Sequence, residues 1–182
     1  GDWVDSHSDV DFTVVTPDDP LALGHVDELE SRGHKAFGPR KNAAIIEASK
    51  AFSKDLMKKY NIPTAAYENF DDAEKALAYL ETASFPIVLK ADGLALGKGV
   101  LICNTLEEAK EGVKEIMLDK HFGSAGNRIV IEEFMTGREV SVLSFVDGNT
   151  IKTMTSAQDH KRAGDGDTGL NTGGMGTFSP SP

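Results

Sequence analysis

Lysines and glycines between residues 90 and 99 form the part of this sequence best suited to bind an anion. Lys90 ends an apolar, strand-like run at 87–90, and it is followed by Gly93, Gly97, Lys98 and Gly99. Because glycine lacks Cβ, its backbone N–H groups can approach a phosphate closely, and lysine adds a compact positive charge. The stretch predicts a loop over nucleotide phosphates. A glycine-rich surface turn is the alternative.

The spacing in this loop differs from that of the Walker A motif, GxxxxGK[ST], which lies between a strand and a helix. Gly93 and Gly97 are one residue too close together, and Gly99 stands where the magnesium-binding Ser or Thr would be. Residues 100–103, Val-Leu-Ile-Cys, favour a strand instead of a helix. We therefore expect a strand–loop–strand flap over a triphosphate.

The elements around the flap predict an α/β (α+β) chain. Residues 1–48 read as the end of a βαβ-type N-terminal domain, with strands at 11–16 and 35–37, a turn at 17–20 and a helix at 23–31. Helices are expected at 41–48 and after Ser49, which is a candidate N-cap.

Residues 64–135 predict a small α+β subdomain around the flap. Its strands are expected at 65–67, 87–90, 100–103 and 128–135, and its helices at 71–81 and from Thr105 to about 117. In residues 136–182, strands at 139–146 and 150–156 flank a hairpin signal, Asp147-Gly148-Asn149. Residues 157–179 show no periodicity, and a loop of that length in a compact domain is usually functional.

Composition limits the classes of partner. The 182 residues carry a net charge of −10, which would repel nucleic acid and anionic membranes, so neither is expected as a partner. No apolar run approaches the roughly 20 residues of a membrane helix. The single cysteine, Cys103, fits a reducing cytoplasm and reads as a buried structural thiol.

Four motifs and their order along the chain resemble those of the ATP-grasp superfamily. The resemblance rests on Lys50, Lys90 before the glycine loop, Glu132-Glu133-Phe134-Met135 and Glu139. It implies that Lys50, Lys90 and the flap (Gly93, Gly97, Lys98, Gly99) bind ATP phosphates. It also implies that residues 132–135 meet the adenine edge and that Glu139 holds the ribose hydroxyls. Residues 49–182 would then be an ATP-grasp domain, with a lid at 64–135 and the start of a large catalytic subdomain at 136–182.

Further motifs closely resemble phosphoribosylamine–glycine ligases. They are FGP at 37–39, SKAFSK at 49–54, KADGLALGKGV at 90–100, AQDHKR at 157–162 and NTGGMG at 171–176. Thr-Pro-Asp-Asp at 16–19 replaces the usual Gly-Pro-Glu-x of that family, and Leu170 replaces a proline. The implied activity is a carbon–nitrogen ligation in purine synthesis. ATP phosphorylates the glycine carboxylate, and the amine of 5-phosphoribosylamine then attacks the glycyl phosphate.

The same resemblance implies a substrate site in the C-terminal residues. Arg162 and Lys161 would meet substrate phosphate or carboxylate, and His160 would act as a general acid or base, or else stabilise the loop by a hydrogen bond. The remaining substrate-binding candidates are Asp159, Asn171, Thr172, Gly173, Gly174 and Met175.

These ligases also use Mg²⁺ (or Mn²⁺), held by an acidic residue and a downstream Glu-x-Asn pair. No such pair follows Gly164, so the metal ligands are expected beyond residue 182. The chain reads as a piece of a longer, monomeric, cytoplasmic enzyme, and the piece alone should bind ATP without turnover. Another ATP-grasp ligase and a non-catalytic nucleotide-binding module remain as alternatives.

Overall fold

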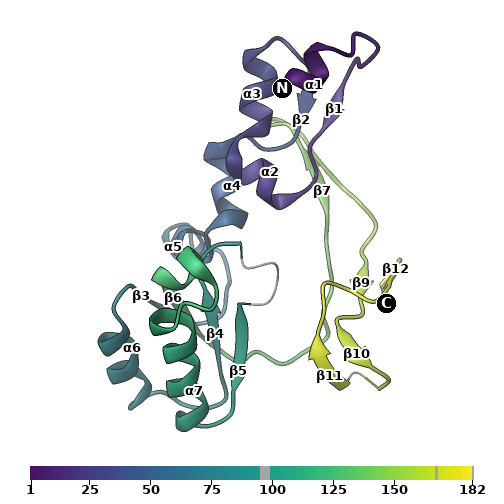
Figure 1. Ribbon diagram of the computed structural model, residues 1–182. Coiled ribbons are helices and arrows are strands. Elements are labelled where there is room, and N and C mark those ends of the chain that lie inside the picture. Colours follow the sequence, from purple (N-terminus) through teal and green to yellow (C-terminus); the bar gives the residue numbers. More distant parts are fainter. Residues whose placement is uncertain (95–98, 167, 182) are drawn as a thin grey trace. The chain divides into compact units, whose positions relative to one another are not determined.

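The computed structural model describes residues 1–94, 99–166 and 168–181 (Figure 1). The chain divides into two compact units, Gly1–Phe134 and Met135–Pro182, and each is described by itself. In the described part of the chain, no helix is both long enough and apolar enough to cross a membrane.

The first unit begins with a parallel strand pair. After α1 (Asp2–Asp5), β1 (Thr13–Val14) pairs in parallel with β2 (Ala36–Phe37), and α2 (Asp18–Leu23) and α3 (His25–Ser31) lie between them in the chain. This pairing confirms the predicted βαβ unit.

The turn predicted at 17–20 is wrong, because α2 starts there. Pro17 is the N-cap, and Asp18 and Asp19 lie at the positive end of the helix dipole. Pro20 is tolerated in the first turn, where backbone N–H groups have no intrahelical partner. Gly24, at φ 93°, ends α2 in the left-handed conformation. The helix expected at 23–31 therefore starts only after Gly24, as α3.

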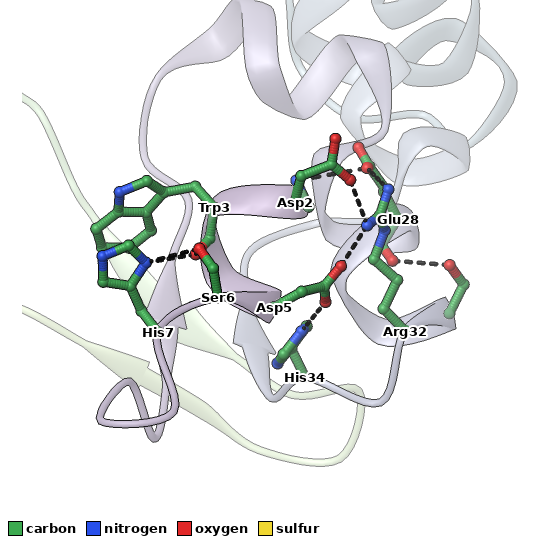
Figure 2. A network of polar contacts seen from close by, with 10 residues as sticks. Asp2, Trp3, Asp5, Ser6, His7, Glu28, Arg32 and His34 are labelled. Carbon is green, nitrogen blue, oxygen red and sulfur yellow. Dashed lines mark hydrogen bonds and ion pairs between the residues drawn. The ribbon is translucent and has the colours of Figure 1, made fainter.

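A polar network ties α1 to α3 (Figure 2). The Arg32 guanidinium contacts the carboxylates of Asp2, Asp5 and Glu28, and His34 Nε2 lies 2.6 Å from Asp5 Oδ1. The hydrogen bond to His34, followed by that from Arg32, lowers the pKa of Asp5. Trp3 and His7 stack with ring centroids 4.0 Å apart. The network lies on the surface and holds the first helix in place.

Two helices lead from this region to the main sheet. α4 (Lys41–Ala48) ends at Ser49, whose extended backbone starts a new helix, α5 (Lys50–Lys59). The Ser49 hydroxyl accepts a hydrogen bond from Phe52 N at 3.1 Å, which confirms the predicted N-cap.

An antiparallel sheet of four strands, in the order β3-β6-β4-β5, forms the centre of the first unit. Its strands are β3 (Tyr67–Phe70), β4 (Ile87–Ala91), β5 (Val100–Cys103) and β6 (Ile129–Glu133). β3 starts later than the predicted 65–67, and β6 is shorter at both ends than the predicted 128–135. β5 follows the glycine loop directly, so the predicted strand–loop–strand arrangement is confirmed.

Helices α6 (Ala73–Leu80) and α7 (Leu106–Val113) lie side by side on one face of the sheet (Figure 1). Asp72 caps α6, and the Thr105 hydroxyl caps α7 by accepting from Glu108 N at 3.2 Å. The helix expected to reach about 117 continues past Val113 as a π-helical segment, Lys114–Leu118. A 3-10 helix, Gly123–Asn127, precedes β6.

The core fills the space between these helices and the sheet. Ile87, Leu89 and Ala91 of β4 join it, whereas Val88 and Lys90 lie on the opposite face, as strand alternation requires. Gly112 of α7 allows close packing, because a Cβ there would lie 2.7 Å from Leu89 Cδ1. Cys103 is buried in this cluster, as predicted, and burial raises its thiol pKa to about 11.

The second unit is built from short strands. β7 (Ser144–Val146) and β8 (Ile151–Thr153) form the predicted hairpin around Asp147-Gly148-Asn149. The stretch expected to be a loop contains four strands, so that interpretation is wrong. They are β9 (Gln158–Asp159), β10 (Arg162–Gly164), β11 (Thr168–Asn171) and β12 (Thr177–Phe178), paired as β10–β11 and β9–β12.

Candidate functional site

A cavity of about 410 Å³ lies in the first unit, on the face of the sheet opposite α6 and α7. Three lysines line it, Lys50 and Lys54 from α5 and Lys90 from β4, together with Glu132 from β6. Asp18 and Asp19 of α2 and Glu47 of α4 contribute carboxylates to the same lining. Lys50 lies at the start of the glycine loop and Lys90 lies next to it in the lining, so this part of the cavity is the one suited to an anion.

Glu132 pairs with two of the three lysines of the cavity. Its Oε2 lies 3.0 Å from Lys90 Nζ and 3.2 Å from Lys54 Nζ, and the Glu132 residue is only 6% exposed. Its other oxygen, Oε1, is buried and has no hydrogen-bond partner among the described residues. A buried carboxylate oxygen without a partner is costly, and it belongs to a residue that also lines the cavity.

The N-terminus of α5 is fastened to the start of the glycine loop. The Asp92 carboxylate accepts hydrogen bonds from Ser49 Oγ at 3.0 Å and from Ala51 N at 3.1 Å. Lys50 Nζ donates to Gly93 O at 2.7 Å, and Gly93 takes φ +99°, where a side chain would be strained. These contacts hold Lys50 at the base of the flap.

Burial lowers the pKa of Lys50 below its ordinary value of 10.5. The carboxylate of Asp92 opposes this shift, and the nearby ammonium of Lys90 adds to it. Placing a second cation close to a partly buried lysine is unfavourable without an anion. The arrangement is therefore the one that a bound phosphate would stabilise.

The flap itself is described only at its two ends. The backbone oxygen of Gly99 accepts a hydrogen bond from Ala91 N at 2.8 Å, so the end of β4 also pairs with the residue that precedes β5. The predicted phosphate contacts of Gly97 and Lys98 lie outside the described residues. The predicted role of the flap stays a prediction.

Residues 132–135 span the end of β6 and the boundary between the units. Glu133 pairs with the backbone of Ala66: its Oε1 accepts from Ala66 N at 3.0 Å, and its own N–H donates to Ala66 O at 2.9 Å. Phe134 closes the first unit, and Met135 opens the second with its side chain exposed. Glu139, also in the second unit, lies 3.4 Å from Lys161 Nζ.

A second hollow, of about 380 Å³, lies within the second unit. His160, Arg162 and Met175 line it, with Asp165 and neighbouring glycines. The Arg162 guanidinium donates to Gly169 O at 2.8 Å, and the His160 ring contacts that of Phe178 at 5.5 Å between centroids. Lys161 O accepts from both Thr172 N and Thr172 Oγ1, which fixes the loop that carries Gly173 and Gly174.

Most of the predicted C-terminal substrate residues thus lie close together. His160 pairs through its backbone with Met175 N and Gly176 O, at 2.7 and 2.9 Å. Asp159 pairs with Thr177 in the β9–β12 ladder, and Asn171 pairs with Arg162 in the β10–β11 ladder. Their chemical roles stay predictions.

Lys54 is the site residue that sequence reasoning missed. A lysine in a helix rich in charged residues is usually solvated, yet Lys54 is only 7% exposed. The signal that could have found it is spacing: it follows the buried Ala51 by three residues and therefore lies on the same helix face.

Comparisons with known proteins cover the whole chain. Residues 48–182 match the family model "Phosphoribosylglycinamide synthetase, ATP-grasp (A) domain", and residues 2–47 match the N-domain model of the same family. A phosphoribosylamine–glycine ligase from Streptococcus pyogenes is 54% identical over 175 residues, which are 96% of this chain and 42% of that protein. The chain thus spans about two fifths of the length of the curated relatives it matches.

Solved structures agree with these matches. The phosphoribosylamine–glycine ligase of Thermotoga maritima superposes with a TM-score of 0.83 at 34% identity, over all of this chain and 44% of that one. The biotin carboxylase domain of Hydrogenobacter thermophilus 2-oxoglutarate carboxylase, solved with MgADP, gives a TM-score of 0.69 at 19% identity, covering 88% of this chain and 36% of its own. The ATP-grasp fold predicted from the sequence is confirmed.

Proposed function

Because the chain belongs to the phosphoribosylglycinamide synthetase family, we propose that it takes part in the ATP-dependent joining of glycine to 5-phosphoribosylamine. The products would be glycinamide ribonucleotide, ADP and phosphate. The observation that carries the proposal is the cavity of the first unit, with Lys50, Lys54 and Lys90 around the unpartnered carboxylate oxygen of Glu132.

The chemistry of the cavity supports ATP as its ligand. Lys50 and Lys90 supply positive charge for the phosphate oxygens, and the flap backbone would add N–H donors. The exocyclic amino group of adenine is a hydrogen-bond donor, and Glu132 Oε1 is a buried acceptor that lacks a donor. Glu139 would accept from the two ribose hydroxyls.

The proposed reaction proceeds in two transfers. An oxygen of the glycine carboxylate attacks the γ-phosphorus and ADP leaves, and the amine nitrogen of phosphoribosylamine then attacks the acyl carbon and phosphate leaves. The protein contributes mainly positioning and charge neutralisation. Arg162 and Lys161 would bind substrate phosphate or carboxylate, residues 171–175 would offer donors to the developing oxyanion, and His160 and Asp159 would complete this site.

ATP-grasp enzymes generally use Mg²⁺ with ATP, and the magnesium complex of a structural neighbour is an example. Among the described residues, no three His, Cys, Asp or Glu side chains come together to hold a metal ion. The roles proposed here rest on side chains and backbone groups of the chain.

We also propose the domain division that the motifs predict. Residues 1–48 would close an N-terminal domain and residues 49–182 would belong to the ATP-grasp domain. The family-model boundary at residues 47 and 48 supports this division. Within it, 64–135 would be a lid and 136–182 would open the large subdomain, a boundary supported by the division between the two units after Phe134. A cytoplasmic monomer is the state we expect.

The experiment measures phosphate release by the native protein, expressed from its whole gene, with ATP and Mg²⁺. Release should require both glycine and phosphoribosylamine, and D-alanine or bicarbonate should not replace glycine. If ATP binds but this pair of substrates gives no release, the proposed substrates are wrong. If ATP does not bind at all, the nucleotide site is wrong as well.

The lowered pKa of Lys50 leads to a pH prediction. Lys50 carries its charge only below its pKa, so ATP affinity should begin to fall at a lower pH than an ordinary lysine would cause. Arginine keeps its charge throughout this range, so Lys50→Arg should hold its affinity to higher pH. Titrations from pH 7 to 10 test this, with Lys75→Arg on the exposed face of α6 as control. Identical profiles for Lys50→Arg and the parent would contradict it.

A further inference from the structure

Lys54 differs from the other two lysines of the cavity in how its ammonium group is used. Its Nζ lies 2.7 Å from Thr64 Oγ1, 3.4 Å from Ala65 O and 3.2 Å from Glu132 Oε2. Its contacts within the described ranges are thus two hydrogen bonds, to Thr64 and Ala65, and an ion pair with Glu132, all of them with the protein itself. The aromatic ring of Tyr67 lies beside it, 5.5 Å from Nζ to the centroid.

Lys50 and Lys90 keep donors for a ligand. Within the described ranges, Lys90 Nζ contacts Glu132 Oε2 and Lys50 Nζ donates to Gly93 O. Lys90 is also more accessible, with its side chain 29% exposed against 9% for Lys54. The Lys54 ammonium is therefore used for contacts within the protein, whereas those of Lys50 and Lys90 are placed to bind phosphate.

We infer that Lys54 is a positioning residue, which holds Glu132 so that Oε1 faces a nucleotide base and Lys90 stays available for phosphate. This rests on the proposed function of the cavity. Thr64, Ala65 and Glu132 come from two separate stretches of chain, so the Lys54 ammonium joins α5 to the segment before β3 and to β6. Glu132 Oε2 is occupied by two cations, and Oε1 is the oxygen that remains.

Two consequences follow when Lys54 loses its charge. Of the two lysines that contact the buried Glu132 carboxylate, Lys90 alone would then be charged. Lys90 would therefore be drawn toward Glu132 and away from phosphate. Glu132 is also held by one cation fewer, so its oxygens are less firmly placed and discriminate less between a base with and without an amino group. A residue that only stabilised the fold would change neither property of the folded protein.

The test compares Lys54→Met, Lys54→Arg and the control Lys59→Met, an exposed lysine of the same helix. For each native-length protein, affinities are measured for ATP and for purine riboside triphosphate, which lacks the 6-amino group. Wild type should prefer ATP. Lys54→Met should bind ATP at least about tenfold more weakly, with the preference largely lost, because Lys90 would then pair with Glu132 in place of phosphate. Lys54→Arg should recover part of both properties, and Lys59→Met should match wild type.

A double-mutant cycle with Glu132→Gln makes the test more specific. If Lys54 acts through Glu132, the effects of the two substitutions on the ATP preference should be strongly non-additive. Additive effects would overturn the inference. So would a Lys54→Met protein with a lower unfolding midpoint but unchanged affinities, since Lys54 would then be structural only.

If Lys54→Met does not fold, the inference can be tested with a second variant. Thr64→Val removes one acceptor of the Lys54 ammonium and keeps its charge, and it should shift the ratio of the two affinities in the same direction by a smaller factor. An unchanged ratio in folded Thr64→Val would overturn the inference. Wild type that binds ATP without any preference would also overturn it while leaving the proposed function intact, whereas wild type that binds no ATP would overturn both.

Discussion

A Lys90→Met variant should bind ATP about 10- to 100-fold more weakly than the parent and bind adenosine about as well as before. The loss corresponds to one charge-assisted contact, about 1.5–3 kcal/mol. Lys90 reaches the cavity from β4, and Lys54 still pairs with Glu132 when Lys90 is removed, so the base-binding end of the site should stay intact.

Paired titrations with ATP and adenosine check this expectation. Methionine keeps most of the volume of lysine, so the sheet should not change. Equal losses for both ligands would show that Lys90 is structural. The signature also differs from that expected for Lys54→Met, which should reduce the preference for the amino group as well as the overall affinity.

The Leu89→Ala variant should lose about 2–5 kcal/mol of unfolding free energy, the usual cost of truncating a fully buried leucine. Leu89 is 0% exposed and packs in the core beneath α7, where Gly112 lets the helix approach it closely. The cavity left behind could not be filled by a small shift of the sheet, since β4 is paired on both sides.

Urea unfolding followed by circular dichroism measures this loss. Ile102→Ala on the neighbouring strand β5 is the matched control, because Ile102 is 37% exposed and should cost clearly less. Similar losses for the two variants would contradict the assignment of the core to the α6–α7 face.

Elements with strong local signals were predicted well from the sequence. α4 has the predicted bounds, Ser49 caps α5, and the glycine loop joins two antiparallel strands. In these segments local propensity and tertiary packing favour the same structure. The order of the motifs was also enough to identify the ATP-grasp fold, because residues of defined type recur at defined places along the chain.

Other features depended on tertiary contacts that spacing alone does not reveal. Pro17 to Pro20 has the composition of a turn, but two acidic residues and a proline are also favourable in the first turn of a helix, and packing of α2 against α4 favours the helix. The strands β9 to β12 are too short for alternation to be visible. Lys54 was missed because its acceptors are distant in sequence or lie in an irregular segment.

The alternation along β4 links the packing of the core to the geometry of the proposed ligand site. Leu89 and Lys90 are neighbours in sequence, yet one belongs to the dry interior and the other to the cavity. A slip of one residue against β6 would exchange them, placing an ammonium in the core and an isobutyl group among the cations. Under the proposed function, such a chain would not bind ATP, and retention on an immobilised ATP resin would separate refolded molecules by strand register.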